Sequence, residues 1–245
     1  MEFRELGSVS LKDLFVREME TCILSGRLAV GEKLPTEREL AQQMKVSRAV
    51  INGGISELAA KGFLDVVPRK GVFVADYKNK GTLDTLLSIL QYSGGMFDPE
   101  MLDSINHVRN CLERDIAMLA AENHTPQELD ALKTQLQRLE ECEEPHTMAE
   151  LTFEFMHLLT LASHNLVHPL MMTGFAGVYI PLLEALYRQG VKKERLALLW
   201  ALVRRIEERD AAGAADAASD IIGWSRTSLE QYYTPGRKFR DQGGA

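Results

Sequence analysis

The feature that most constrains the fold is a series of local signals between residues 34 and 74. Thr36 is followed three residues later by Glu39, which is the spacing of a capping box at the start of a helix. Ser47 is a good N-cap for a second helix, and Gly62 is placed to end that helix in the left-handed conformation. The short link between the two leaves room only for a tight corner. The order of signals therefore predicts a helix-turn-helix.

A β-hairpin is predicted directly after it. Residues 63–67 and 72–75 are short β-branched runs, and residues 68–71 (Pro-Arg-Lys-Gly) join them with a basic turn. Residues 11–24 place apolar side chains at helical spacing and supply a further helix in front. Together these elements predict a winged helix-turn-helix domain over residues 1–77.

The charges of this stretch favour DNA as a partner. From Arg38 to Lys70 it holds six basic and three acidic residues, in a chain whose net charge is −7. Arg48, Ala49 and Asn52 lie in the first turns of the second helix, where side chains reach base edges once such a helix enters the major groove. The alternative is a small α+β domain with ordinary solvated charges.

The segments ILSGRLAVGEKLPTERELAQQMKVSRAVI and ELAAKGFLDVVPRKGVFV resemble the winged-helix domain of the GntR family of bacterial transcription regulators. The resemblance covers about residues 9–77 and implies an N-terminal domain that binds a double-stranded DNA operator. The residues that it places at the DNA are Arg38, Ser47, Arg48, Ala49, Asn52, Arg69, Lys70 and Gly71.

This chain departs from the family pattern within the second helix. Asn52 stands where the family commonly has an arginine that reads guanine, and an asparagine side chain prefers adenine. Gly53 and Gly54 follow, and each mid-helix glycine costs about 0.8–1 kcal/mol relative to alanine. We therefore expect an operator sequence that differs from the one common in the family. We also expect a recognition helix that becomes fully ordered only on DNA.

Composition is that of an ordinary soluble protein, with 45% hydrophobic and 26% charged residues. Cys22, Cys111 and Cys142 are odd in number and lack metal-ligand spacing, which favours reduced thiols in a cytoplasmic protein. The first ten residues lack the apolar core of a signal peptide, and no apolar run is long enough to span a bilayer. We expect no membrane partner.

From residue 82 onward the sequence carries only helical signals. It predicts an all-helical ligand-binding and dimerisation domain over residues 82–233, followed by a frayed tail at 234–245. The predicted helices are 82–92, 99–123, 125–141, 148–163, 166–190, 191–209 and 214–232. The longest apolar one is expected to bend at Pro169 and Pro181. The predicted fold class is mainly α, with a helical bundle behind the winged helix.

The segments LDSINHVRNCLERDIAMLAAEN and AELTFEFMHLLTLASHNLVHPL resemble the effector domain of the FadR subfamily of this family. The subfamily divides into members that hold a divalent metal and members that bind a long-chain acyl-CoA without one. The metal-ligand positions fall on Thr152, Met156, Leu199 and Ile221, and none of these side chains suits such a cation. His164 and His168 are four residues apart, but across a predicted helix break. We expect no metal and no cofactor.

The metal-free resemblance implies an acyl cavity lined by Tyr179, with Gly223 on the last helix. Arg226 follows at a position suited to a phosphate or carboxylate. Phe153 and Met156 are candidates for the tunnel wall, with the alternative that they are simply core. Arg109 is either a carboxylate-binding arginine or half of a surface pair with Glu113.

These observations predict a homodimeric, ligand-responsive regulator that reads a short pseudo-palindromic operator. The expected effector is a fatty acyl-CoA or another apolar acid, and the alternative is a small polar carboxylate metabolite. An enzyme on a helical bundle is a remote alternative, because the sequence contains no GxSxG, P-loop or HExxH motif. An architectural DNA protein without an effector would need less chain than the helical half provides.

Overall fold

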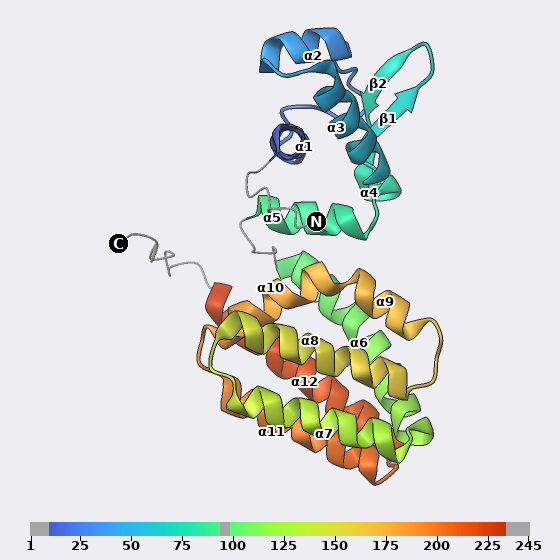
Figure 1. The fold of residues 1–245 in the computed structure, drawn as a ribbon, viewed down its shortest axis with the longest axis vertical. Coiled ribbons are helices and arrows are strands. Elements are labelled where there is room, and N and C mark those ends of the chain that lie inside the picture. Colours follow the sequence, from blue (N-terminus) through green and yellow to red (C-terminus); the bar gives the residue numbers. More distant parts are fainter. Residues whose placement is uncertain (1–9, 94–98, 234–245) are drawn as a thin grey trace, which may run out of the picture. The chain divides into compact units, whose positions relative to one another are not determined.

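The computed structural model describes residues 10–93 and 99–233. The chain divides into two compact units, residues 1–94 and 95–245, and each is described here by itself. The predicted fold class is confirmed: the described residues are mainly helical, with one small antiparallel sheet in the first unit. Figure 1 shows this sheet beside the helices of the N-terminal unit and the helical bundle of the second unit.

The N-terminal unit is a winged helix-turn-helix with a further helix at its end. Its elements are α1 (Leu11–Leu24), α2 (Glu37–Met44), α3 (Arg48–Ala60), β1 (Leu64–Val67), β2 (Gly71–Val74), α4 (Tyr77–Lys80) and α5 (Leu83–Tyr92). Its core is formed by buried side chains from α1, from α3 and from the segment that leads into β1, among them Phe15, Ile51, Leu58 and Phe63.

The predicted helix boundaries at the corner are confirmed. Thr36 and Glu39 form the reciprocal capping box at the start of α2. Lys45 makes the corner in the left-handed conformation, and the Ser47 hydroxyl accepts a hydrogen bond from the Val50 amide at the start of α3. Gly62 follows α3 with a φ of 77°, as expected of a C′ glycine. Local capping chemistry therefore fixes the angle at which α3 is presented.

The wing is an antiparallel hairpin in which Leu64 pairs with Val74 and Val67 pairs with Gly71. Arg69 turns the chain at the tip with a positive φ of 64°. Lys33 forms an isolated antiparallel bridge to Phe73, which ties the link before α2 to the outer edge of the hairpin.

Helix α5 belongs to the N-terminal unit, whereas the sequence placed it at the start of the helical domain. The Thr85 hydroxyl donates to the Lys61 carbonyl oxygen at 2.5 Å, and the Ser88 hydroxyl donates to Glu20 Oε1 at 2.7 Å. Both hydroxyl residues are buried. The leucines of this helix suggested a place in the helical domain. Its other face carries Thr85 and Ser88, which make the hydrogen bonds to the end of α3 and to α1.

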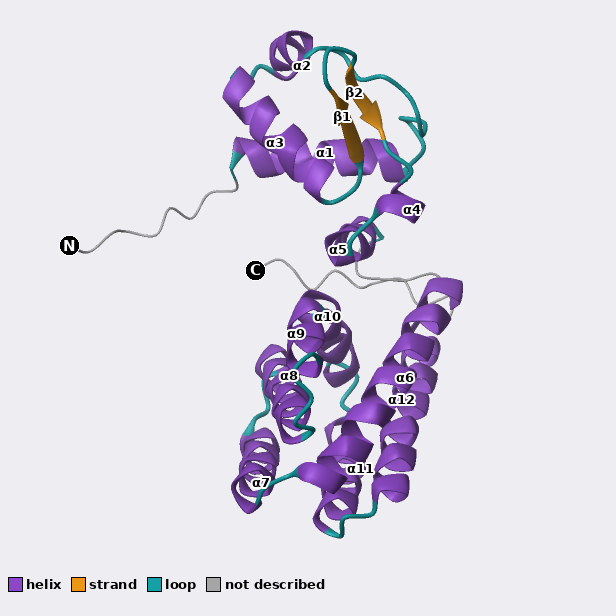
Figure 2. Cartoon of the chain, turned by 90° about the vertical axis from the view of Figure 1, so that its right-hand side faces the viewer, coloured by secondary structure: helices purple, strands orange, loops and turns teal. Residues whose placement is uncertain are grey.

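The second unit is a helical bundle, with α6 and α12 lying side by side along its length (Figures 1 and 2). Its elements are α6 (Pro99–Asn123), α7 (Pro126–Glu141), α8 (Pro145–Ala162), α9 (His168–Gly174), α10 (Ala176–Tyr187), α11 (Lys192–Glu207) and α12 (Ala211–Tyr233). Within the described residues from 82 onward there is no strand, as predicted.

The predicted helix over residues 166–190 is two helices, and the break lies at Phe175 rather than at either proline. Pro169 sits in the first turn of α9, where its missing N–H is harmless, and Pro181 is accommodated inside α10. The two helices bend by 66°. No single described helix has the length and hydropathy to cross a bilayer, and only this bent pair meets that test when its two parts are joined.

Candidate DNA interface and buried effector site

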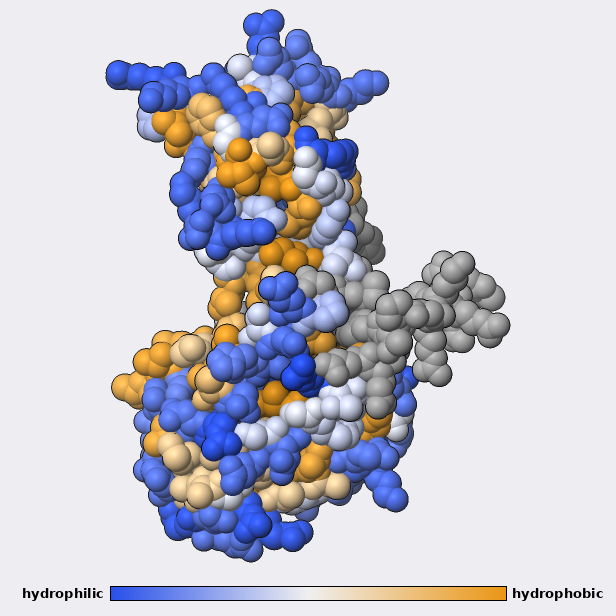
Figure 3. All heavy atoms as spheres, turned by 180° about the vertical axis from the view of Figure 1, so that it is seen from behind, coloured by the Kyte–Doolittle hydropathy of each residue, from blue (hydrophilic) through white to orange (hydrophobic). Residues whose placement is uncertain are grey.

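The predicted base-reading side chains lie together on the exposed side of the α2–α3 corner. Arg48, Ala49 and Asn52 point away from the buried face of α3, which carries Ile51 and Ile55. Arg38 on α2 and Ser47 at the corner are also exposed and complete the predicted list on these two helices. Figure 3 shows hydrophilic side chains over the end of this unit that carries α2.

One acidic residue holds two of these side chains. The Asn52 side-chain amide donates to Glu37 Oε1 at 3.3 Å, and the Arg48 guanidinium lies 3.9 Å from Glu37 Oε2. Glu37 stands at the first position of α2, so it reaches across the corner to α3. These contacts are exposed and weak, and a DNA phosphate or base edge can replace them.

The wing presents Arg69 and Lys70 at its exposed tip. Gly71, also on the predicted list, has a φ of 123°, and a Cβ there would lie 2.8 Å from Cε of Lys33. The Lys33 side chain is flexible and could move aside, but the φ of 123° is strained for any residue with a Cβ, so the backbone conformation favours glycine at this point. The basic tip and the reading edge of α3 belong to the same unit, but their assignment to DNA stays a prediction.

The two glycines of α3 have different roles, which the sequence did not distinguish. A Cβ on Gly54 would lie 2.6 Å from Cε1 of Phe15 and closer still to Cδ1, so α1 packs directly on the α3 backbone here. A Cβ on Gly53 would meet only the Lys12 side chain, at an ordinary 3.6 Å. Gly54 is a packing requirement, whereas Gly53 is a conformational cost without a steric reason.

The second unit holds a buried polar cluster around Arg109. Its Nε donates to Glu113 Oε1 at 2.9 Å, and the Tyr179 hydroxyl donates to the same oxygen at 2.5 Å. The guanidinium also lies 4.7 Å from the centre of the Tyr179 ring. Arg109 and Glu113 are 7% and 2% exposed, so the surface-pair alternative is wrong. These side chains join α6 to α10 inside the bundle.

Electrostatics inside this cluster follow from burial and from the Glu113 carboxylate. Burial raises the pKa of the Tyr179 hydroxyl, and the negative charge of Glu113 raises it further. Burial lowers the pKa of Arg109, but the adjacent Glu113 outweighs this and the net shift is upward. Tyr179 therefore stays a neutral donor and Arg109 stays a cation.

Two further polar residues lie buried in the bundle, and sequence reasoning missed both. Asn106 accepts from the Arg109 guanidinium through Oδ1 at 3.5 Å, and its Nδ2 has no hydrogen-bond partner among the described residues. Arg195 on α11 is 1% exposed and donates from Nη1 to the Ser225 hydroxyl at 2.9 Å. A signal was present: Arg195 precedes the buried Leu199 by four residues, which places it on the inner face of α11.

Two of the predicted effector residues lie outside this cluster. Gly223 is exposed on α12, with no atom within 4 Å of a Cβ built there. Arg226 is about half exposed and forms an ion pair with Asp103 on α6 at 2.8 Å. Their resemblance-based role in binding an effector stays a prediction, and the structure does not bring them to Arg109.

The predicted apolar lining belongs to the bundle core. Phe153 is half-buried and contacts the Tyr179 ring edge-on, with ring centres 6.2 Å apart. Met156 is 3% exposed. The same packed core also contains Leu159, Met172, Leu183, Leu202 and Ile206. These residues are therefore core residues, and the polar cluster around Arg109 lies among them.

The metal-ligand positions of the FadR subfamily do not fit a cation in this chain. Thr152, Met156, Leu199 and Ile221 are all buried in the apolar core. The Thr152 hydroxyl is engaged by the Met148 carbonyl and by the Tyr187 hydroxyl. Over residues 10–93 and 99–233, no group of three or more His, Cys, Asp or Glu side chains is arranged to hold a metal ion.

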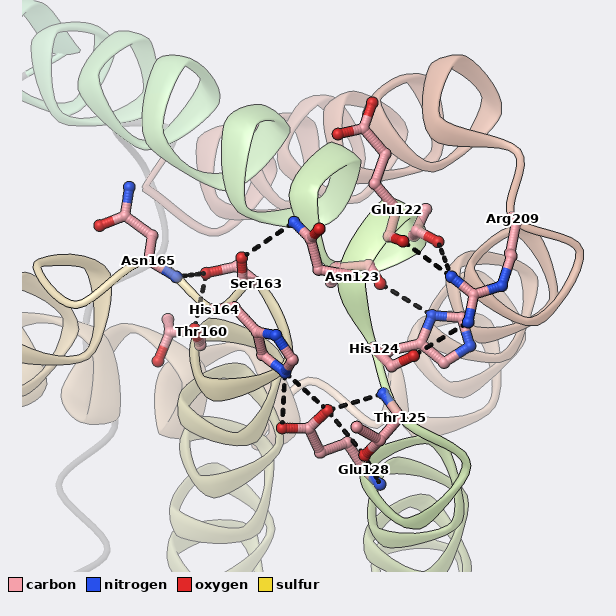
Figure 4. Close-up of polar contacts among 12 residues, drawn as sticks. Glu122, Asn123, His124, Thr125, Glu128, Thr160, Ser163, His164, Asn165 and Arg209 are labelled. Atoms are coloured by element: carbon pink, nitrogen blue, oxygen red, sulfur yellow. Dashed lines mark hydrogen bonds and ion pairs between the residues drawn. The ribbon is translucent and has the colours of Figure 1, made fainter.

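The two histidines at i, i+4 spacing have separate partners. His164, at the end of α8 with a φ of 54°, lies 3.0 Å from Glu128 Oε2 (Figure 4). His168 lies 3.2 Å from Asp115 and contacts the Ser163 hydroxyl. Each histidine therefore has its own carboxylate partner, and the two do not form a shared ligand set.

Comparison with known proteins agrees with both units. Residues 15–74 match the family described as bacterial regulatory proteins, gntR family, and residues 104–223 match the FCD domain. The transcriptional regulator Mce2R of Mycobacterium tuberculosis is 29% identical over 221 residues, which cover 90% of this chain and 92% of the relative. The galactonate operon transcriptional repressor of Escherichia coli is 25% identical, covering 85% of this chain and 92% of its own length.

A fatty acid metabolism regulator protein of Shewanella pealeana is 28% identical over 149 residues, or 61% of each chain. Among solved structures, Lar, which controls the expression of the Listeria monocytogenes agr system, has a TM-score of 0.60 at 14% identity, covering 91% of this chain and 98% of that one. This last likeness shows the fold alone. These families and relatives are transcription regulators and not enzymes. The chain therefore belongs to the GntR family of regulatory proteins, with an FCD domain behind its winged helix.

Proposed function

We propose that this DNA-binding regulator works in the cytoplasm as a homodimer that reads a short pseudo-palindromic operator. The observation that carries the proposal is the exposed edge of α3, where Arg48 and Asn52 stand together beside Ser47. Two such edges related by a two-fold axis read two half-sites about one helical turn apart. The full chain, 27.5 kDa, should sediment as a dimer.

Arg48→Ala tests the DNA interface. Operators are first selected from random duplexes with the full-length protein, and affinities are then compared in a gel shift at fixed salt. Loss of a base-reading arginine should cost about 1–3 kcal/mol, which is about a 5- to 150-fold loss of affinity. Arg204→Met, an exposed arginine of α11, is the matched control and should bind the operator like wild type. Equal affinity of Arg48→Ala and wild type would contradict the placement of α3.

We further propose that the FCD unit senses an apolar acyl ligand, either a free fatty acid or a fatty acyl-CoA, in which an uncharged thioester replaces the carboxylate. Arg109 and Tyr179, set among apolar side chains, support this choice. The small polar carboxylate remains the second candidate, since a relative carries galactonate in its name. Native mass spectrometry of the purified protein separates the two: a co-purifying long-chain species supports the first, and a sugar acid supports the second.

A further inference from the structure

We propose that Arg195 and Asn106 join Arg109 to bind the free carboxylate of the effector inside the bundle. This inference rests on the proposed acid-sensing role of the FCD unit and names a site for it. The three side chains come from α6 and α11, and Ser225 on α12 holds Arg195 in place at 2.9 Å. An anion bound here would therefore contact residues from both α6 and α11.

The charges of the buried cluster do not balance. Arg109 is paired with Glu113, but no described carboxylate lies within ion-pair distance of Arg195. A buried cation without a counter-charge is strongly disfavoured, because it loses hydration that nothing replaces. Burial lowers the pKa of Arg195 and the positive charge of Arg109 lowers it further, whereas the Tyr187 hydroxyl and the Glu113 carboxylate raise it. Two buried guanidinium groups therefore share the single negative charge of Glu113. The missing element of this cluster is one negative charge.

Hydrogen bonding points to the same deficit. Asn106 Nδ2 and Arg195 Nε are buried and have no partner, and they are the only such side-chain atoms among the described residues. Both are donors, so the missing partner must be an acceptor. Buried water would satisfy the donors but would not supply the charge. A carboxylate supplies both, with two oxygens matched to the fork of a guanidinium.

The chemistry of the surroundings narrows the ligand class. Thr152 and Tyr187 already satisfy each other at 2.6 Å, so they offer no fixed donor for a string of ligand hydroxyls. The remaining neighbours are core apolar side chains. A free monocarboxylate with an apolar body meets these conditions, whereas a thioester or methyl ester brings no charge to this place.

The test compares straight-chain monocarboxylates from six to sixteen carbons with their methyl esters, using the full-length protein. Thermal unfolding and titration calorimetry are measured on wild type, Arg195→Met, Asn106→Ala and the exposed control Arg204→Met. Wild type and Arg204→Met should be stabilised by at least one acid of the series and by none of the esters. Arg195→Met should bind that acid about ten- to a hundredfold more weakly, and Asn106→Ala several-fold more weakly.

A measurement on the ligand-free protein separates a ligand-binding role of Arg195 from a structural one. Because Arg195 is a buried, unbalanced cation, the apo form of Arg195→Met should unfold at the same temperature as wild type or higher. Unchanged acid binding by Arg195→Met, equal response to acids and esters, or no response of wild type to any acid would each overturn the proposal. Operator binding of the same proteins is measured in parallel. If wild type binds no operator but still responds to the acid, the proposed regulator function is contradicted and the proposed carboxylate site is not.

Discussion

Replacing each glycine of α3 in turn gives a sharp test of how the recognition helix is built. Gly53→Ala adds a methyl group to a position where only Lys12 lies nearby, at 3.6 Å. The gain is the mid-helix difference between glycine and alanine, about 0.8–1 kcal/mol. For a unit of this size, that corresponds to a rise of about 3–8 °C in its unfolding transition.

Gly54→Ala is the matched control, one residue away on the same helix. Its Cβ would overlap the ring of Phe15, which is 3% exposed and cannot move aside. Overpacking of a core typically costs about 1–3 kcal/mol, which cancels or exceeds the gain in helix propensity. This variant should therefore be no more stable than wild type and as much as about 2 kcal/mol less stable. Adding Phe15→Leu should recover part of that loss, because the two sites are in contact.

Calorimetry of the full-length variants decides the stability, and a gel shift decides the effect on DNA. If α3 becomes firm only on the operator, Gly53→Ala should tighten operator binding by up to about fivefold, because part of the ordering cost is removed beforehand. A lower unfolding temperature for Gly53→Ala, or an equal rise for both variants, would refute the packing argument.

Other consequences of the structure are open to measurement. Tyr179→Phe removes the donor to Glu113 while keeping the ring over Arg109, so thermal unfolding should show a loss of about 1–3 kcal/mol, and effector response in a gel shift should weaken while operator binding persists. Glu144 caps α8 through the Thr147 and His146 amides, which lower its pKa to about 2, below its ordinary value. Its stabilising effect is therefore present above the ordinary carboxylate pKa of about 4.3 and is lost as pH falls towards 2. Glu144→Ala should unfold at a lower temperature than wild type at pH 7, and this difference should shrink as pH falls from about 4.3 to below 2.

Much of the N-terminal unit could be predicted because its signals are local. A capping box, an N-cap serine and a C′ glycine each act within four residues, so Thr36, Ser47 and Gly62 reveal α2 and α3 without knowledge of the rest. The role of Gly54 could not be found this way, because it depends on a packing contact with Phe15, which lies in another helix.

The buried cluster was only partly visible for a related reason. Arg109 and Glu113 are four residues apart, which suits both a surface pair and a buried one, and only tertiary packing decides between them. Arg195 was missed because a single arginine on an apolar helix face is usually long enough to reach water. Here the neighbouring helices cover it completely, and its partner Ser225 is thirty residues further along the chain.

Hydrogen bonds connect α5 to α1 and to the end of the recognition helix α3. The Thr85 hydroxyl donates to the carbonyl of Lys61, the residue that caps α3, and the Lys61 ammonium lies 2.9 Å from the buried Glu20. Ser88 donates to the same Glu20 oxygen, beside a cavity of about 440 Å³ between α1 and α5. Burial opposes the charge of Lys61, but the Glu20 and Glu57 carboxylates outweigh this and raise the pKa of Lys61, so Lys61 stays charged. A shift of α5 must therefore either break a hydrogen bond to a buried carboxylate or be accompanied by a movement of α1 and of the end of α3. Through Lys61 and Glu20, the position of α5 is therefore coupled to the helix that carries Arg48 and Asn52.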